Sequence, residues 1–289
     1  MASERRSVMV TGASTGIGRA CVADLVRAGF HVWAAVRRTE DEESLLREHP
    51  DGVSVVRMDL TDEASVRAAG KVVCAAGPLH GLVNNAGVAL AGPLEYLPIE
   101  VFRRQIEINL TGQLIVTQSV SPALRQAAES GDDPRIVMVG SIGGRIAGPM
   151  LGPYHAAKFG LAGLSDSLRA ELAPFGIAVI LVEPGTIATP IWETGRAAAD
   201  ELVKQLPAEA DRYAEQIRKT RANAVKSGET GISPYHVSLV IVKALTAAKP
   251  RPRQLVGRDA KIAALLARFL PYPLLYRVTA AKKAVKRAG

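Results

Sequence analysis

Short apolar runs alternate along the chain with longer stretches of helical spacing. The apolar runs predict strands over Ser7–Thr11, His31–Val36, Val53–Met58, Gly81–Asn84, Arg135–Val139 and Ile177–Val182, with a last strand at Arg253–Gly257. Near-continuous apolar strands separated by helices are typical of a parallel sheet that is covered on both faces. The predicted fold class is therefore α/β: a doubly wound, Rossmann-type parallel sheet of about seven strands with helices on both faces.

The stretches between the strands predict helices. The first runs from about Gly16 to Ala28 and is followed by Gly29, a residue typical just past a helix end, and the longest is Ile99–Ala128. The 289 residues are enough for one large α/β domain and few for two. We expect a single domain over 1–289, in which a helical segment at about 187–232 covers the carboxyl ends of the strands, where ligands bind in such sheets.

The composition argues against a membrane-spanning or a secreted protein. Hydrophobic residues make up 48% of the chain, but no apolar run reaches the ~18 residues that suggest a membrane span. The N-terminus lacks the apolar core and the cleavage site of a secretion signal, and Cys21 and Cys74 have no ligand-like spacing. These features favour a cytoplasmic location, with both thiols buried and inert.

Charge is unevenly distributed along the chain. The net charge is +8, but the segment 249–289 holds 11 Lys and Arg residues and one acid, Asp259, so it carries +10 and the rest carries −2. The basicity therefore belongs to the C-terminal tail at about 258–289. This distribution argues against a nucleic-acid-binding body.

A glycine-rich turn follows the first predicted strand. The chain reads T-G-A-S-T-G-I-G from Thr11, which places glycines at 12, 16 and 18 between a strand and a helix. One glycine permits the tight turn, one lets the backbone approach a pyrophosphate, and one lets the helix pack closely on the strand. The pyrophosphate would lie at the helix N-terminus, where unsatisfied N–H groups favour negative charge. We expect a dinucleotide to be bound by Gly12, Ser14, Thr15, Gly16, Ile17 and Gly18.

The end of the second strand predicts which dinucleotide is bound. An acidic residue there would bond the ribose 2′-hydroxyl of NAD and would repel the 2′-phosphate of NADP. The strand runs instead into Arg37 and Arg38. The guanidinium of Arg37 is planar and always charged, which suits a phosphate, although the pair could simply be solvated beside Glu40 and Asp41. We expect NADP(H) to be preferred over NAD(H).

A second set of residues carries the chemistry. Tyr154 and Lys158 are four residues apart in a predicted helix, so their side chains share one face. Ser141 follows the fifth predicted strand, and Asn109 lies within the long predicted helix. The turn TGASTGIG, together with Asn109, Ser141, Tyr154 and Lys158 in this order, resembles the short-chain dehydrogenase/reductase family. The resemblance covers about 8–257.

The resemblance implies an oxidoreductase that transfers a hydride between a nicotinamide and a carbonyl or alcohol. Tyr154 would be the general acid/base, and Ser141 would hold and polarise the substrate oxygen. A free tyrosine, with a pKa of about 10, is a poor base at neutral pH, so Lys158 would lower the pKa of Tyr154 and also bond the nicotinamide ribose. Asn109 would support a water that passes protons to Lys158. This chemistry requires no metal.

Three further segments resemble nucleotide-contacting parts of the family. Asp59, with Leu60 beside it, would contact the adenine, although Asp59 could equally cap a helix that begins near Thr61. The sequence N-N-A-G begins at Asn84 and would border the nicotinamide ribose through Asn85, Ala86 and Gly87. After the sixth strand, the carboxamide and the phosphates would be contacted by Pro184, Gly185, Thr186, Ile187 and Thr189.

Two competing interpretations of the motif residues are disfavoured by local geometry. His155 lies one position after Tyr154, which points its side chain about 100° away on a helix. We therefore expect His155 to be structural or to face the helical segment at 187–232, which would act as a lid. Ser141 lies in G-S-I-G-G, which lacks the G-x-S-x-G elbow of serine hydrolases.

The tail contains an amphipathic stretch over Asp259–Leu270. Its apolar residues Ile262, Leu265, Leu266, Phe269 and Leu270 form one stripe, and Pro271 and Pro273 then break the helix. The stripe could pack on its own domain or across an oligomer, or it could lie on anionic lipid as a peripheral membrane contact.

The motifs and the tail together resemble the steroid- and retinol-type members of the family. This resemblance implies a small, apolar ketone or secondary alcohol as substrate, and a homodimer or homotetramer. Within the same chemistry, the alternative is a 3-oxoacyl-thioester reductase. Outside it, the alternatives are a cofactor-sensing regulatory protein, which would have no need for Tyr154, and a basic-tailed adaptor for membrane or nucleic acid.

Overall fold

The computed structural model describes residues 5–280, within which seven parallel strands form one sheet in the order β3-β2-β1-β4-β5-β6-β7. The strands are β1 (Ser7–Thr11), β2 (His31–Val36), β3 (Val53–Arg57), β4 (Gly81–Asn84), β5 (Arg135–Val139), β6 (Ala178–Pro184) and β7 (Arg253–Val256). The order reverses at β1, which is followed on one side by β2 and on the other by β4, as in a doubly wound sheet. The predicted fold class is confirmed.

The helices fall between the strands and beyond the last of them. In the first half of the chain they are α1 (Gly16–Arg27), α2 (Thr39–Glu48), α3 (Glu63–Ala75), α4 (Ile99–Ile106), the π-helical turn η1 (Glu107–Thr111) and α5 (Gly112–Glu129). The second half contains η2 (Ile142–Gly144), α6 (Gly152–Leu172), η3 (Ala173–Phe175), α7 (Ile191–Val203), η4 (Ala208–Tyr213), α8 (Ala214–Thr230), α9 (Pro234–Thr246), α10 (Arg258–Phe269) and α11 (Tyr272–Thr279).

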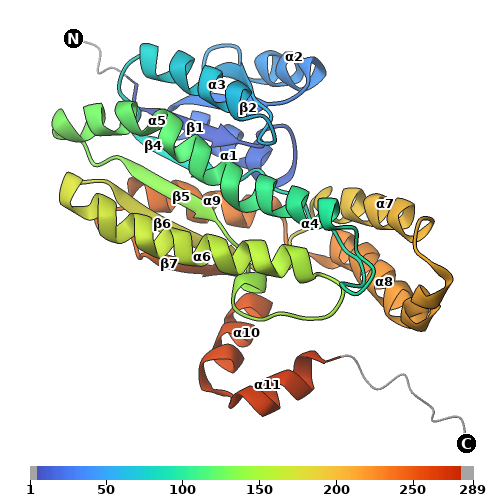
Figure 1. Cartoon of the computed structure of the whole chain (residues 1–289). Coiled ribbons are helices and arrows are strands. Elements are labelled where there is room, and N and C mark those ends of the chain that lie inside the picture. The colour runs from blue at the N-terminus through green and yellow to red at the C-terminus, as the bar shows by residue number, and fades with distance from the viewer. Residues whose placement is uncertain (1–4, 281–289) are drawn as a thin grey trace, which may run out of the picture.

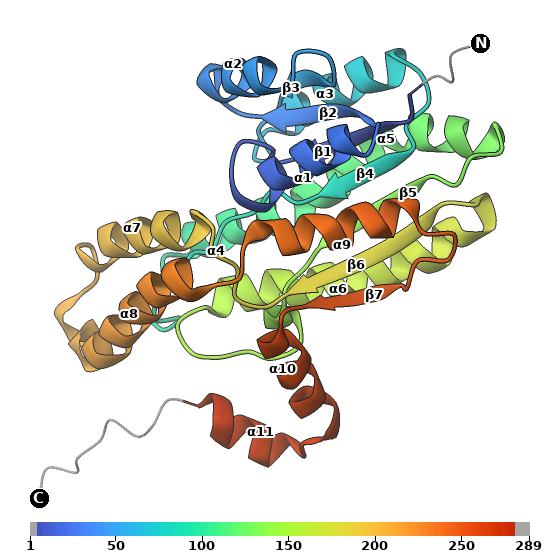
Figure 2. The same cartoon turned by 180° about the vertical axis from the view of Figure 1, so that it is seen from behind.

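Helices cover both faces of the sheet, and each face has its own apolar core. On one face α1, α2 and α9 bury residues such as Leu25, Leu45 and Ile241 against the strands. On the other face α3, α5 and α6 bury residues such as Leu124 and Leu161. Figures 1 and 2 show these two layers from opposite sides. The strands are buried between the layers, which is why they read as near-continuous apolar runs in the sequence.

Apart from shifts of one or two residues at the ends of elements, two of the predictions differ from the structure. The long helix predicted over Ile99–Ala128 is divided, because the turn η1 widens the helix between α4 and α5. In the tail, Pro271 ends a helix as predicted, but Pro273 does not prevent a second one, because α11 starts at Tyr272. Proline is tolerated in the first turn of a helix, where its missing N–H has no partner to lose.

The segments outside the repeating strand–helix units lie apart from the two layers. The predicted helical segment at 187–232 contains α7 and α8, which stand together at the end of the sheet to which the strands run (Figure 1). In both views α10 and α11 project below the sheet. No helix among residues 5–280 combines the length and the apolar character of a membrane span.

Candidate active site

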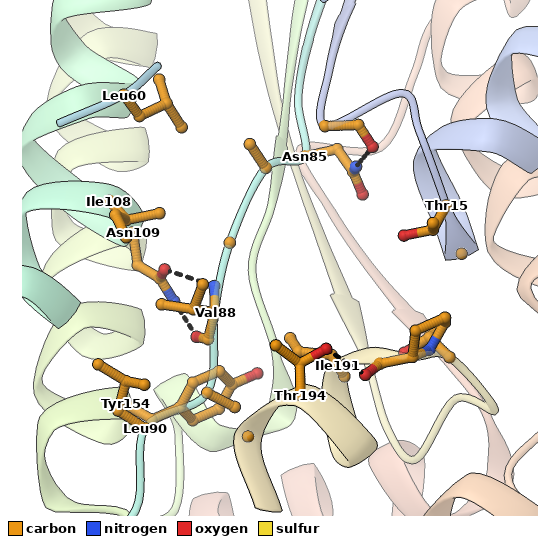
Figure 3. A pocket seen from close by; sticks show the side chains of 18 of the residues that line it. Thr15, Leu60, Asn85, Val88, Leu90, Ile108, Asn109, Tyr154, Ile191 and Thr194 are labelled. Atoms are coloured by element: carbon orange, nitrogen blue, oxygen red, sulfur yellow. Dashed lines mark hydrogen bonds between the residues drawn. The ribbon is translucent and has the colours of Figure 1, made fainter. Parts of the chain in front are cut away.

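A cavity of about 810 Å³ lies at the carboxyl ends of the strands and gathers the predicted site residues. The four residues predicted to be catalytic line it, as do all those predicted to bind the cofactor except Gly18 and Thr186: Asn109, Ser141, Tyr154 and Lys158, with Gly12, Ser14, Thr15, Gly16, Ile17, Arg37, Asp59, Leu60, Asn85, Ala86, Gly87, Pro184, Gly185, Ile187 and Thr189. Figure 3 shows Thr15 on one side of this cavity and Asn109 and Tyr154 on the other. Segments far apart in the sequence therefore meet at one site.

The glycine-rich turn is shaped by close backbone contacts. Gly12 has a φ of +63°, and a Cβ added to it would lie 2.8 Å from the Cα of Ala86. A Cβ at Gly18 would overlap the carbonyl oxygen of Gly12, so Gly18 shapes the turn from behind the cavity without lining it. No side chain caps the N-terminus of α1, where Thr15 is the N-cap residue. The first N–H groups of α1 are thus available to a phosphate.

The two arginines after β2 differ in their contacts. Arg38 forms a two-pronged salt bridge with Asp41, its Nε and Nη2 each 2.9 Å from a carboxylate oxygen. Arg37 is exposed, lines the cavity and forms no salt bridge within residues 5–280. One guanidinium is therefore neutralised by its own chain, and the other is available to an anion.

Asp59 does not cap a helix, so that alternative for it is wrong. Helix α3 is capped by Asp62, whose Oδ1 accepts the backbone N–H groups of Ala64 and Ser65. The Oδ1 of Asp59 instead accepts two hydrogen bonds from Thr61, at 2.9 Å from its backbone nitrogen and 2.8 Å from its hydroxyl.

The charge state of Asp59 follows from several neighbours. Partial burial acts to raise the pKa of this carboxyl group, but the hydrogen bonds from Thr61 and the charges of Arg37 and Arg104 outweigh it and lower the pKa. Asp59 is therefore a carboxylate at neutral pH, at the edge of the cavity and under the influence of Arg37.

The loop that follows β4 is fixed by Asn109. The Oδ1 of Asn109 accepts the N–H of Val88, and its Nδ2 donates to the Val88 carbonyl, both at 2.9 Å (Figure 3). Asn109 lies in the π-helical turn η1 and is almost completely buried. Turns of this kind often occur at functional sites, and here the turn coincides with a residue that resembles part of the catalytic set.

Two glutamines that sequence reasoning missed extend this clamp. Gln105 accepts the N–H of Leu90 at 2.7 Å and donates to the Val88 carbonyl at 2.9 Å, while Gln113 donates to the Ala86 carbonyl at 2.7 Å. Together with Asn109, these side chains present an amide every four residues toward one loop. That spacing along a predicted helix was the available signal, since residues four apart share a helix face.

Thr11 is a further missed residue, and it joins the glycine-rich turn to the loop after β4. Its Oγ1 accepts the backbone N–H groups of Asn85 and Ala86, at 2.9 and 3.0 Å. The side chain of Asn85 returns a hydrogen bond to the Thr11 carbonyl at 2.9 Å. Both walls of the cavity at this point are thus held by one buried hydroxyl.

Ser141, Tyr154 and Lys158 converge at the inner end of the cavity. Ser141 is the N-cap of η2, where its Oγ accepts the N–H of Gly143 at 3.0 Å. Tyr154 and Lys158 lie one turn apart on α6, and the Lys158 Nζ is 5.8 Å from the centre of the Tyr154 ring. The same Nζ donates to the Val139 carbonyl at 2.9 Å. The ammonium group is thus anchored to the end of β5, beside the tyrosine.

Burial controls the protonation of the tyrosine and the lysine. It raises the pKa of Tyr154, and the hydrogen bond with Ser141 offsets this only in part. It also lowers the pKa of Lys158 to about 8. The sequence predicted that Lys158 would lower the pKa of Tyr154. In the structure the loss of solvent around the phenol instead raises this pKa, and the phenol is protonated at neutral pH.

The turn that carries Ser141 is held by two side chains outside the motif. Arg145 forms a two-pronged salt bridge with the buried Glu183, at 2.7 and 2.6 Å. His155 places Nδ1 2.9 Å from the Gly143 carbonyl and accepts the N–H of Gly148 at Nε2, at 3.1 Å. His155 therefore supports the 143–148 loop and, as expected, points away from the reacting side of Tyr154.

The turn after β6 connects the cavity with the lid helices, α7 and α8, and with the tail. Trp192, at the start of α7, donates its indole N–H to the Ile187 carbonyl at 2.7 Å. The backbone N–H of Thr186 donates to a carboxylate oxygen of Asp259 at 2.7 Å, so it does not face the cavity. A Cβ at Gly185 would overlap this carboxylate. The first turn of α10 is thereby attached to a wall of the site.

A second cavity of about 520 Å³ adjoins the first beneath the lid helices. The two share Ala89, Ala91, Ile191, Trp192, Gly195 and Ala199. Most of the surface of the second cavity is apolar, and the end of α11 borders it through Thr279 and Ala280. A substrate that reaches Tyr154 from this side would be in contact with mostly apolar groups.

The chain is similar to proteins of one family throughout. The sequence model described as short chain dehydrogenase matches residues 6–200. NADPH-dependent 3-dehydrocapnine reductase of Ornithobacterium rhinotracheale is 32% identical, over 87% of this chain and 88% of that protein, and human retinol dehydrogenase 5 is 34% identical, over 93% and 86%. A short chain dehydrogenase from Burkholderia cenocepacia, solved with NADP, is 25% identical with a TM-score of 0.73, over 95% of this chain and 98% of that one. Solved structures of this fold include a complex with NAD as well.

Proposed function

This chain belongs to the short-chain dehydrogenase/reductase family, and we propose that it is an NADP(H)-dependent member that interconverts a carbonyl group and a secondary alcohol on an apolar substrate. As a member of the family it is an oxidoreductase with a Rossmann-type, NAD(P)-binding fold. The observation that carries the proposal is the meeting of Ser141, Tyr154 and Lys158 in the same cavity as the uncapped N-terminus of α1.

The residues around the cavity fit a dinucleotide. The absence of side chains at Gly12 and Gly18 keeps the first turn close to the sheet, and the open end of α1 suits a pyrophosphate. Asp59 and Leu60 would border the adenine, and Asn85 to Gly87 with Lys158 would border the nicotinamide ribose. When bound, the nicotinamide would supply or accept the hydride.

The proton is assigned to Tyr154. Its raised pKa keeps the phenol protonated at neutral pH, the form required of an acid that gives its proton to the substrate oxygen during reduction. In the oxidative direction the same oxygen would take the proton from the alcohol, and the ammonium of Lys158 nearby would favour the phenolate.

Ser141 is assigned to holding the substrate oxygen. Its Oγ accepts the N–H of Gly143, and its hydroxyl forms a hydrogen bond with Tyr154, so a substrate oxygen beside the phenol would be within reach of this hydroxyl, which would donate to it as negative charge develops. Asn109, which fixes the loop after β4 and lies in the π-helical turn, would support a water that passes protons to Lys158.

The preference for NADP(H) is supported by the two arginines after β2. The guanidinium of Arg37 has no carboxylate partner within the described chain, whereas that of Arg38 is satisfied by Asp41. A free guanidinium at this position suits a 2′-phosphate, and the end of β2 carries no acid that would repel one.

The apolar substrate is supported by the second cavity, whose surface is largely apolar. The similarity to a retinol dehydrogenase is consistent with this class of substrate. The same proposal includes peripheral contact with a membrane through the tail, where apolar side chains of α10 are exposed.

The test is a comparison of substrates with NADPH consumption as the readout. Lipophilic ketones should give a higher kcat/KM than small polar ketones and 3-oxoacyl thioesters. The Tyr154→Phe variant should still bind NADPH but lose about 10²- to 10⁴-fold in rate, the usual contribution of general acid–base catalysis. Turnover confined to small polar ketones would refute the substrate class, and a preference for thioesters would favour a 3-oxoacyl-thioester reductase.

A further inference from the structure

Helix α10 packs on the protein with its small side chains and exposes its large ones. Ala260 and Ala264 are buried, whereas Ile262, Leu265 and Phe269 are 59%, 58% and 69% exposed. The three exposed residues are spaced i, i+3 and i+7, so they form one stripe on the outer side of the helix. Leu266 and Leu270, which also belong to the predicted stripe, are half-buried, so packing on the domain involves only part of the stripe and leaves an oligomer or a lipid surface for the rest.

Helix α11 extends the exposed apolar surface. Tyr272, Leu274 and Tyr276 are 78%, 45% and 60% exposed. Tyrosine is enriched where proteins meet the boundary between lipid and water, because its ring is apolar and its hydroxyl is polar. Figures 1 and 2 show α10 and α11 together on one side of the molecule, clear of both helical layers.

Positive charge surrounds this surface. Arg258, Lys261, Arg268 and Arg277 are exposed, and the one acidic residue of the two helices, Asp259, accepts a hydrogen bond from the Thr186 backbone. In the sequence, the residues after 280 add four more basic residues and no acid. A second copy of the chain that covered this surface symmetrically would bring like charges together, whereas an anionic surface would neutralise them.

The exposed surface also adjoins the second cavity. α11 leads away from the stripe and ends at Thr279 and Ala280, which border that cavity opposite residues of α8. The cavity in turn adjoins the one that holds Tyr154, and the two share lining residues such as Trp192. A surface on which α10 and α11 lay would therefore reach the border of the apolar cavity.

We propose that α10 and α11 form an interfacial anchor that rests the chain on anionic phospholipid, so that apolar substrates enter the second cavity from the bilayer. The stripe and the tyrosines enter the headgroup region, and the surrounding basic side chains bind lipid phosphates and carboxylates. The anchoring specifies the membrane contact included in the proposed function and is argued from the exposed surface, while the route of the substrate rests on the proposed catalysis.

The charge requirement is tested by vesicle co-sedimentation of the full chain. Wild type should sediment with vesicles of phosphatidylcholine and phosphatidylserine, bind phosphatidylcholine alone weakly, and be released by salt. Lys261→Glu with Arg268→Glu should weaken binding at least tenfold, since each basic residue near such a surface contributes about fivefold. The matched control is Arg67→Glu with Lys71→Glu on α3, which makes the same change of charge on the opposite side and should bind like wild type.

The apolar requirement is tested by a second matched pair. Phe269→Ser should reduce vesicle binding several-fold. Phe175 is also exposed, at 60%, but it lies at the other end of the strands, so Phe175→Ser should not reduce binding. Equal effects of the members of either pair, or no binding by wild type, would overturn the anchor. A dimer of wild type that Phe269→Ser dissociates, in the absence of vesicle binding, would assign the surface to a second copy instead.

The route of the substrate is tested by turnover. A lipophilic ketone dissolved in anionic vesicles should be reduced several-fold faster by wild type than by Phe269→Ser, and the two should reduce a water-soluble ketone at equal rates. Equal rates in vesicles would refute entry from the bilayer. Vesicle binding without turnover of any ketone would refute the proposed function and leave the anchor supported, because co-sedimentation does not depend on activity.

Discussion

Replacing Arg37 with alanine should weaken the binding of NADPH and leave that of NADH almost unchanged. Arg37 forms no salt bridge in the described chain, so its guanidinium is available to the 2′-phosphate, which carries about −1.5 to −2. At about 4 Å in a water-like dielectric, the attraction between the single positive charge of Arg37 and a phosphate of charge about −2 is worth about 2 kcal/mol. This corresponds to a loss of about 30-fold in NADPH affinity in Arg37→Ala. NADH has no phosphate at this position and should change by less than about twofold.

Arg38→Ala is the matched control for this prediction. It removes an identical side chain from the next position, but one whose charge is already matched by Asp41. Its effect on NADPH affinity should therefore be small. Both variants can be titrated with the two cofactors by nicotinamide fluorescence, at low and at moderate salt. An unchanged ratio of NADPH to NADH affinity in Arg37→Ala, or an equal loss in Arg38→Ala, would refute the assignment of the phosphate to Arg37.

The remaining predictions concern the interior of the site. Lys158→Met should abolish turnover yet raise the free energy of unfolding at pH 7, measured with urea, by on the order of 2 kcal/mol. The lowered pKa of Lys158 destabilises the wild-type fold by about 3 kcal/mol below pH 8, and the variant loses about 1 kcal/mol of this gain with the hydrogen bond to Val139. Because the folded pKa is the lower one, this gain should disappear as the pH rises from about 8 toward 10.5, and a constant gain would contradict it. The rate of ketone reduction should fall above pH 8 as Lys158 loses its proton, with Lys158→Arg moving that limb to higher pH. Gly18→Ala should abolish the binding of both cofactors, whereas Gly163→Ala, at a position with open space around it, should bind them normally. Gln113→Leu should lower the melting temperature, because the carbonyls of Ala86 and Ile108 lose their donor at a cost of about 1–3 kcal/mol each.

Most of the sheet could be predicted from the sequence, for a reason particular to parallel sheets. β2 was predicted to the residue because His31–Val36 is enclosed by helices and neighbouring strands, so that its apolar run is nearly unbroken. The π-helical turn could not be predicted. It is held by contacts with distant parts of the chain, such as Asn109 with Val88, and these leave no periodic pattern in the local sequence. α11 was missed because Pro273 was interpreted as a breaker, although its position near the start of a helix is compatible with one.

The residues of the candidate site also fall into those that could be identified from the sequence and those that could not. Residues that must have one chemical identity, such as Tyr154 and Lys158, form spaced motifs and could be identified from the sequence. Residues that hold the surrounding loops in place, such as Thr11 and Arg145, could not, because many side chains can donate to or accept from the same groups. The pKa of Tyr154 was predicted in the wrong direction, since the sequence shows which charge is near but not how much solvent is lost.

The contact of Asp259 with the turn after β6 gives the two sides of α10 different freedom to change during evolution. On the inner side, the carboxylate occupies the space that a Cβ at Gly185 would need and accepts the N–H of Thr186, so these positions can change only in a concerted way. On the outer side, Ile262, Leu265 and Phe269 make few contacts with their own chain, so they can be substituted as the surface that they contact changes. Orthologues adapted to different surroundings should therefore diverge along the outer stripe while position 259 covaries with position 185. The inner side of α10 would then be constrained by the site wall, and its outer side by the surface that it contacts.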